Sequence, residues 1–263
     1  MKTSTKIWLI VAAALVFLGT IMFSATLFFA DWDFSKISTT KYEQNSYNIS
    51  DSFENIWIDT DTADIKFLLS GNGECKVECF EEKKARHEVK IENGTLFINE
   101  KEEKAWYDYI NIGFGTPKIT VYLPKADFSS VYIKESTGDI SFSKLSVKDI
   151  DLSLSTGDIL LSDVKCENLV TKGSTGEVEL KKVIASNKFD IKRSTGDIEL
   201  NVCDAAEIFI ETDTGDVEGS LLSPKTFATK TSTGEIHVPQ TNEGGLCQIT
   251  TSTGDIEIYL GEK

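Results

Sequence analysis

A five-residue motif, Ser-Thr-Gly-Asp-Ile, recurs at a nearly constant interval through the second half of this 263-residue chain. The first copy occupies residues 136–140. Seven copies are present, with slight variation in sequence, and their central glycines are Gly138, Gly157, Gly176, Gly196, Gly215, Gly234 and Gly254. A fixed period of this length is typical of repeat proteins in which each unit buries its apolar face only against its neighbours. The repeat therefore predicts a solenoid or a similar array.

Apolar residues within one repeat form three groups, and inside each group they alternate with polar residues, as in a strand with one buried face. The last apolar residue of one group and the first of the next are an odd number of residues apart. Along a straight strand such a step would point the next group outward, so its side chains stay inward only if the chain turns a corner there. The motif, residues 143–144 and residues 148–149 are polar and supply three corners. We therefore predict an all-β fold, a three-sided parallel β-solenoid with about 19 residues per rung. A meander of antiparallel hairpins is the alternative, and the handedness of the coil does not follow from the pattern.

The motif glycines are expected to form structural turns, because glycine accepts positive φ without steric cost. An acid follows each of them: Asp139, Asp158, Glu177, Asp197, Asp216, Glu235 and Asp255. Stacked rungs would bring these acids within about 4.8 Å of one another, where like charges repel by about 1 kcal/mol in water. Hydrogen bonds in the turn are our main expectation for what offsets the repulsion, and a column of bound cations is the alternative. The chain lacks the Gly-Gly-x-Gly-x-Asp pattern of calcium-binding β-rolls.

Residues 7–30 carry no charged side chain. As a helix rising about 1.5 Å per residue they are long enough for a hydrocarbon core about 30 Å thick. Lysines precede this stretch and aspartates follow it, which predicts a single-pass anchor in the cell membrane with the N-terminus cytoplasmic and the rest extracytoplasmic. A cleaved signal peptide is the alternative. Phe23 and Phe28 argue against it, because they stand where a cleavage site needs small residues.

Composition divides the chain into four parts: a cytoplasmic stub and transmembrane anchor (1–30), a polar tether (31–52), a degenerate β segment or cap (53–116) and regular β-solenoid repeats (117–263). Within the degenerate segment, Asn93-Gly94 predicts a β-hairpin. Residues 61–67 look like a worn copy of the motif with Ala63 in the glycine position. The separation between this worn copy and the copy at 136 is close to a whole number of repeats, namely four, so we expect the coil to begin there.

The sequence contains no catalytic constellation and no cofactor or phosphate-binding motif that we can identify. A net charge of −15 argues against nucleic acid and an anionic membrane surface as partners. Cys166, Cys203 and Cys247 lie on or near the inward pattern, which predicts buried free thiols, and Cys75 and Cys79 are too far apart along one strand to bridge each other. His87 and His237 lack the spacing of a metal site. The Ser/Thr rows of the motif and three aromatic residues are candidate ligand-binding surfaces, with cap packing as the alternative role of the aromatics: Trp106, Tyr107 and Tyr109.

The apolar N-terminal stretch, the β segment ending in Val-Tyr-Leu-Pro-Lys at 121–125 and the tandem motif together resemble one family. It is the bacterial "putative adhesin" family of β-strand-repeat envelope proteins with a domain of unknown function, which includes LiaG-like proteins. The resemblance covers residues 50–263 and implies a membrane-tethered, extracytoplasmic β-solenoid. It supplies no active site.

We therefore expect a non-enzymatic cell-envelope protein that binds a wall polymer, a surface or an envelope protein. A solenoid enzyme acting on carbohydrate is one alternative, with paired carboxylates about 5–10 Å apart in a groove. The other is an envelope scaffold that assembles end to end, because the last unit, ending at Leu260, offers an uncapped strand edge. A flat or aromatic face would favour the binding protein.

Overall fold

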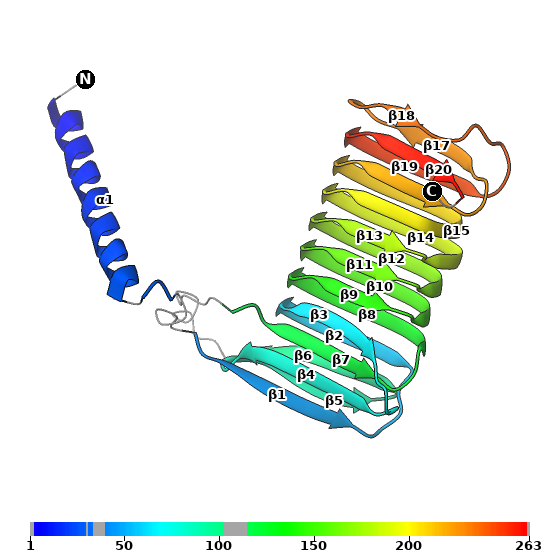
Figure 1. Ribbon diagram of the computed structural model, residues 1–263, viewed down its shortest axis with the longest axis horizontal. Helices are drawn as coiled ribbons and strands as arrows, with labels where there is room; N and C mark the ends of the chain where they lie inside the picture. The colour runs from blue at the N-terminus through cyan, green and yellow to red at the C-terminus, as the bar shows by residue number, and fades with distance from the viewer. Residues whose placement is uncertain (1–2, 30, 34–39, 103–114, 262–263) are drawn as a thin grey trace. The chain divides into compact units, whose positions relative to one another are not determined.

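The computed structural model of the chain describes residues 3–29, 31–33, 40–102 and 115–261 (Figure 1). It comprises two compact units, one made of Met1–Tyr42 and Lys104–Gly115, the other of Glu43–Glu103 and Thr116–Lys263. The first unit contains helix α1 (Thr3–Phe29). The second contains the β-sheet, apart from the first residue of β1 (Tyr42–Ile49).

Helix α1 is apolar along its length, and its segment Ser4–Phe29 is long and apolar enough to cross a membrane. The hydroxyls of Thr20 and Thr26 each donate a hydrogen bond of 2.9 Å to the carbonyl oxygen one helical turn earlier. These polar groups are thus satisfied within the helix, as a hydrocarbon environment requires. Length and composition therefore fit a membrane-spanning helix, and a signal sequence near an N-terminus passes the same test.

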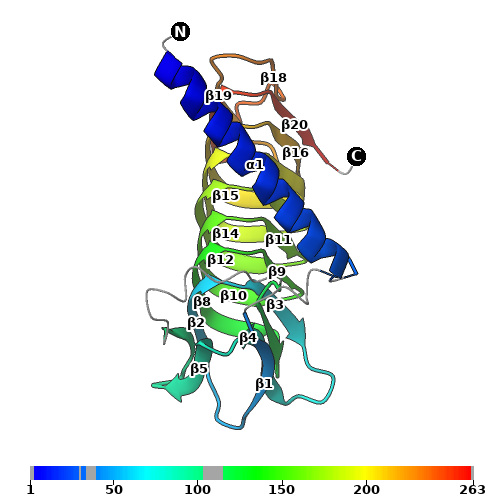
Figure 2. The same cartoon turned by 90° about the vertical axis from the view of Figure 1, so that its left-hand side faces the viewer.

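Two rows of parallel strands build the repeat region, and Figure 2 shows members of the longer row stacked rung upon rung. The long row contains β8 (Asp127–Thr137), β10 (Ser146–Thr156), β12 (Lys165–Thr175), β14 (Ile184–Thr195), the second part of β15 (Ile198–Thr214) and β19 (Leu246–Thr253). The short row contains β9 (Ile140–Ser143), β11 (Ile159–Ser162), β13 (Val178–Lys181), the first part of β15, β16 (Val217–Leu221) and β20 (Ile256–Leu260). Parallel pairing throughout these rows rules out the antiparallel meander here.

The ladder register reproduces the sequence period. Val147 pairs with Cys166, which holds the equivalent position of the next repeat, and the extra residue of the following rung produces an irregularity between Ala185 and Lys188. Lys144 turns the chain between the two rows at a φ of 58°. The corner expected at 148–149 falls inside β10, where the ladder omits Lys148 but the strand continues. Each repeat therefore shows two strands, and a three-sided cross-section remains a prediction.

The N-terminal end of the stack differs from the expected order of rungs. Strand β2 (Asn55–Thr62) pairs directly with β8, and β3 (Asp64–Leu69) pairs with β9, so the worn motif copy is one rung from the copy at 136 and not four. The next rung outward is formed by β6 (Thr95–Glu102) and β7 (Lys118–Leu123). Residues 117–135, at the start of the segment that we expected to consist of regular repeats, therefore contribute to two rungs with β2–β3 between them.

Antiparallel strands close this end. Strand β5 (Ala85–Glu92) forms the predicted hairpin with β6, and Asn93 and Gly94 have φ values of 50° and 72°. Strand β4 (Cys75–Glu82) pairs antiparallel with β7, and β1 pairs with β4. Residues 42–49, which we assigned to the tether, therefore belong to the sheet.

The C-terminal end is also permuted. Strands β19 and β20 lie between β15–β16 and the strands β17 (Thr226–Lys230) and β18 (Ile236–His237), which precede them in the sequence. The last unit of the chain is thus an inner rung, and the terminal edge belongs to β17–β18. This corrects the expectation of an uncapped last unit, and it explains why Ile236 is 41% exposed although it occupies an inward position of the motif.

The interior of the stack is a continuous column of apolar side chains contributed by its rungs. Ile140, Ile159, Val178, Ile198, Val217 and Ile256 follow one another in the short row and are fully buried. The five cysteines are buried and free. Burial of this column is the main stabilising contribution, and it holds the outer face and the motif edge in fixed register.

Candidate functional site

The motif glycines line up along one edge of the stack, each against the backbone of the neighbouring rung. Their φ values lie between 126° and 148°, a region that L side chains rarely adopt. A Cβ atom on Gly138 would come 2.1 Å from the carbonyl oxygen of Ala63, which places the worn copy in the same column. The spatial order is Gly138, Gly157, Gly176, Gly196, Gly215, Gly254 and Gly234.

The aspartates that follow the glycines hold the next rung through its backbone. Asp139 Oδ1 accepts a hydrogen bond from the backbone N–H of Asp158 at 2.9 Å, and Asp158 Oδ1 accepts one from Glu177 at 2.8 Å. The contact recurs from Asp197 to Asp216, from Asp216 to Asp255 and from Asp255 to Glu235. One oxygen of each of these aspartates is therefore committed to the turn, which favours the structural role. Cation binding by this column remains a prediction.

The expected ligand-binding aromatics Trp106, Tyr107 and Tyr109 lie outside the described residues. The structure places a different aromatic group on the outer face of the long row. Trp57 lies between Tyr132 and Phe97, because β2 is paired with β8 on one side and with β6 on the other. We call Phe97, Trp57 and Tyr132 the aromatic platform.

The platform rings follow one another across three paired strands, with Phe97 tilted by 44° against Trp57. The Trp57 and Tyr132 rings stack with centroids 3.9 Å apart and planes 21° from parallel, and the Phe97 ring is 6.4 Å from Trp57. Trp57 is 38% exposed even though it is packed on both sides. Exposed aromatic groups of this kind are characteristic of binding surfaces.

Polar side chains flank the platform. On one side the Ser130 hydroxyl donates a hydrogen bond of 2.8 Å to Asn55 Oδ1, and on the other Lys134 Nζ lies 3.3 Å from an Asp59 carboxylate oxygen. All four residues are two positions from a platform ring on β2 or β8, so they share its face. The surface therefore combines exposed ring edges with hydrogen-bond donors and acceptors at fixed positions.

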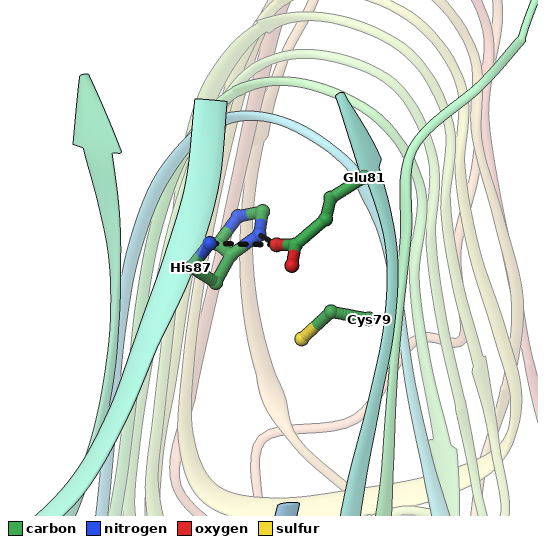
Figure 3. A group of neighbouring side chains, drawn as sticks. All are labelled: Cys79, Glu81 and His87. Atoms are coloured by element: carbon green, nitrogen blue, oxygen red, sulfur yellow. Dashed lines mark hydrogen bonds and ion pairs between the residues drawn. The ribbon is translucent and has the colours of Figure 1, made fainter. Parts of the chain in front are cut away.

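A second group of functional side chains is buried near the N-terminal end of the stack, where Cys79, Glu81 and His87 meet (Figure 3). Cys79 and Glu81 lie two positions apart on one face of β4, and His87 comes from β5. Their potential ligand atoms all lie within 4.8 Å of one another. We missed this group in the sequence because His87 has no metal-type spacing to either partner. The Cys-x-Glu alternation followed by a returning strand was the available signal.

Hydrogen bonds surround the carboxylate of Glu81. Its Oε2 accepts the backbone N–H of His87 at 2.6 Å and lies 2.7 Å from His87 Nδ1, while Oε1 accepts a bond of 2.6 Å from Asn45. His87 Nε2 is 2.9 Å from the hydroxyl of Thr60. Burial opposes ionisation of Glu81, but the bonds from His87 and Asn45 leave its pKa below the usual value. Burial raises the pKa of the Cys79 thiol to about 12.

His237, the other histidine, is exposed, and its Nε2 lies 3.9 Å from a carboxylate oxygen of Glu235.

Comparisons with known proteins address the fold. The sequence model described as Toastrack DUF4097 matches residues 53–263. No curated protein matches the sequence. A crystal structure of a "putative adhesin" from Bacteroides fragilis NCTC 9343 is similar with a TM-score of 0.53 and 18% identity, over 83% of this chain and 97% of that one. This likeness shows the fold alone.

Two further structures come from Parabacteroides distasonis ATCC 8503. One is described as a "putative lipid binding protein", with 17% identity and a TM-score of 0.48, and the other as a "putative adhesin", with 14% identity and a TM-score of 0.49. Each comparison covers 84% of this chain and 98% of the other.

Proposed function

The chain belongs to the Toastrack DUF4097 family, and from this premise we propose that it is a membrane-anchored, non-enzymatic binding protein of the cell envelope whose aromatic platform holds a polysaccharide. The observation that carries the proposal is the aromatic platform, in which Trp57 stacks on Tyr132 and Phe97 lies tilted beside it, together with its polar flanks. A role in surface binding agrees with the description of the Bacteroides fragilis protein as a "putative adhesin".

The platform suits a chain of sugar rings for a chemical reason. The C–H groups of a pyranose pack against the apolar edges that the stacked rings expose, while its equatorial hydroxyls point sideways toward polar partners. Asn55 and Ser130 on one flank, and Asp59 and Lys134 on the other, offer acceptors and donors at those positions. Successive rings follow one another from rung to rung, so a linear polymer can lie across the strands.

The hydrogen bonds made by the aspartates of the motif edge favour a binding role over catalysis. The aspartates that follow one another along the motif edge each hold the backbone of the next rung. A glycosidase would need two carboxylates free to exchange protons with a substrate. We accordingly propose no catalytic residue and no cofactor.

The remaining parts of the proposal concern placement in the cell. We propose that α1 anchors the chain in the cell membrane as a single pass, with the N-terminus cytoplasmic and residues from 31 onward extracytoplasmic. The tether then comprises residues 31–41, the degenerate segment begins at 42, and the regular three-sided coil occupies residues 127–260. Within such a coil the ladder hydrogen bonds fix the orientation of the binding face relative to the other rungs.

A pull-down identifies the ligand class. The full chain in detergent micelles is mixed with insoluble peptidoglycan, with immobilised teichoic acid, or with solubilised envelope proteins. The proposal predicts retention on a polysaccharide and release by soluble fragments of that same polymer. Retention only by an envelope protein, or by neither polymer, contradicts it.

A further inference from the structure

Three side chains whose types can ligate a metal ion converge in the buried corner between β4 and β5 (Figure 3). Cys79 and Glu81 are fully buried and His87 is 4% exposed. This group combines a thiol, a carboxylate and an imidazole that are shielded from solvent. The acids of the motif edge, by contrast, are all carboxylates and are exposed. None of these residues belongs to the aromatic platform, so their role is independent of polysaccharide binding.

We propose that this group is a zinc-binding site, with Cys79 Sγ, Glu81 Oε2 and His87 Nδ1 as the protein ligands. Sulfur and imidazole nitrogen select a borderline transition-metal ion over Mg²⁺ or Ca²⁺, which prefer oxygen. Charge supports the same choice, because a thiolate and a carboxylate with a neutral imidazole neutralise one dication. A buried site of zero net charge avoids the large cost of burying an unpaired ion.

Neighbouring side chains are arranged as metal ligands usually require. A metal-bound histidine normally uses its other ring nitrogen to donate to an oxygen, and His87 Nε2 lies 2.9 Å from the Thr60 hydroxyl. The second carboxylate oxygen of Glu81 is likewise held, by Asn45. These two supporting residues come from β2 and β1, so an ion here would link four strands.

The linked strands define what the ion does. Together with β6 and β7, they form the end of the stack where parallel rungs give way to antiparallel strands. Three protein ligands leave one position of a tetrahedral ion for water, but burial keeps substrates from it. The site is therefore structural, and it fastens the N-terminal cap.

Cys79 separates this proposal from a simple buried Glu–His pair. The hydrogen bonds of Glu81 and His87 are complete without the thiol, so a purely structural pair would not depend on it. Cys75 is the matched control, because it is also a buried free thiol on the same face of β4 but lies outside the group.

The test uses the full chain in detergent micelles, reduced and stripped of metal, titrated with Zn²⁺ by calorimetry and with Co²⁺ by absorption spectroscopy. We expect one Zn²⁺ per chain and a thiolate-to-cobalt charge-transfer band. Cys79→Ser should weaken Zn²⁺ binding about tenfold or more and abolish the band, because it removes a direct ligand. Cys75→Ser should change neither.

Absence of one-to-one binding, or unchanged affinity in Cys79→Ser, overturns the proposal. Absence of the cobalt band in the unmodified chain overturns it too, and this readout does not depend on the folding of any variant.

Discussion

Gly157 lies against the carbonyl oxygen of Gly138, so close that a Cβ atom on Gly157 would come 1.9 Å from that oxygen. The same residue has a φ of 134°. Space and backbone conformation therefore both exclude a side chain. The contact recurs at every motif glycine in the stack, and it sets how closely the rungs approach along this edge.

Replacing Gly157 with alanine should lower the free energy of unfolding by about 3 kcal/mol or more, because strain at positive φ adds to a backbone clash. Denaturant unfolding of the full chain in micelles, followed by circular dichroism, measures the change. Gly71→Ala is the control, since no atom lies within 4 Å of its added Cβ. Equal stability of the two variants would show that the rungs are not packed in this way.

Val202 occupies the corner between the short and long rows at a φ of 57°, where the preceding rungs have Lys144, Asp163 and Lys182. A β-branched residue is strained in this region. Val202→Asn should raise the free energy of unfolding by about 1 kcal/mol, because asparagine tolerates the left-handed conformation. Lys182→Asn at the same corner, in the neighbouring rung, should change it less. A destabilised Val202→Asn variant would argue against this corner geometry.

Asp158 accepts the backbone N–H of Glu177, and this bond predicts different results for two substitutions. Asp158→Asn keeps an acceptor oxygen and should be nearly neutral, whereas Asp158→Ala should cost about 1 kcal/mol. Thermal unfolding with and without calcium at about 1 mM, a typical upper limit for extracellular calcium modules, checks the alternative. A calcium-dependent rise in melting temperature that Asp158→Asn removes would restore the cation column.

Glu135 is buried, and burial raises the pKa of its carboxyl from 4.5 to about 8, assisted by the nearby charges of Asp64, Asp139 and Asp61. The hydrogen bond from the Ala63 backbone N–H acts in the opposite direction. Between pH 4.5 and 8 the folded chain therefore holds a proton that the unfolded chain releases. This contribution to stability is complete below pH 4.5 and is lost as pH rises, at about 1.4 kcal/mol per pH unit.

Glu135→Gln should remove that slope and leave the variant more stable than the parent at pH 8. Urea unfolding of both chains across this pH range gives the difference in their free energies of unfolding. The contributions of the other titrating groups are the same in both chains and cancel. Parallel pH profiles for the two chains would show that Glu135 is ionised or exposed in the folded protein.

Much of the rung could be predicted from the sequence because one period contains all its determinants. The alternation at Ile140 and Phe142, the polar residues at 143–144 and the glycine of the motif are local signals for strand, corner and turn. The Asn93-Gly94 hairpin was predictable for the same reason.

The order of the rungs could not be predicted from the sequence. Each repeat has nearly the same strands, so each offers nearly the same strand edge for a neighbour to pair with. Nothing in the period prevents β20 from pairing with β16 while β18 lies outside it. The aromatic platform depends on such a permutation. Trp57 and Tyr132 have the same separation in sequence as the worn motif copy and the copy at 136, yet only direct pairing of β2 with β8 brings their rings together.

The buried Cys79 group could not be predicted for a related reason. Its histidine approaches across a hairpin, and its supporting residues Thr60 and Asn45 come from strands far away in the chain. The sequence spacings that identify metal sites apply to ligands within one local motif, whereas this site is assembled by tertiary contacts.

The affinity of the full chain for solubilised fragments of a wall polysaccharide tests the binding surface most directly, with Trp57→Ala compared against Phe209→Ala. Phe209 is the matched control, because it lies in the same outward row of the long strands but has Asp190 and Gln248 as its neighbours. We predict that Trp57→Ala raises the dissociation constant about tenfold or more, as loss of a central aromatic contact does, while Phe209→Ala leaves it unchanged. Equal affinities of the parent chain and both variants would contradict the platform as the binding site.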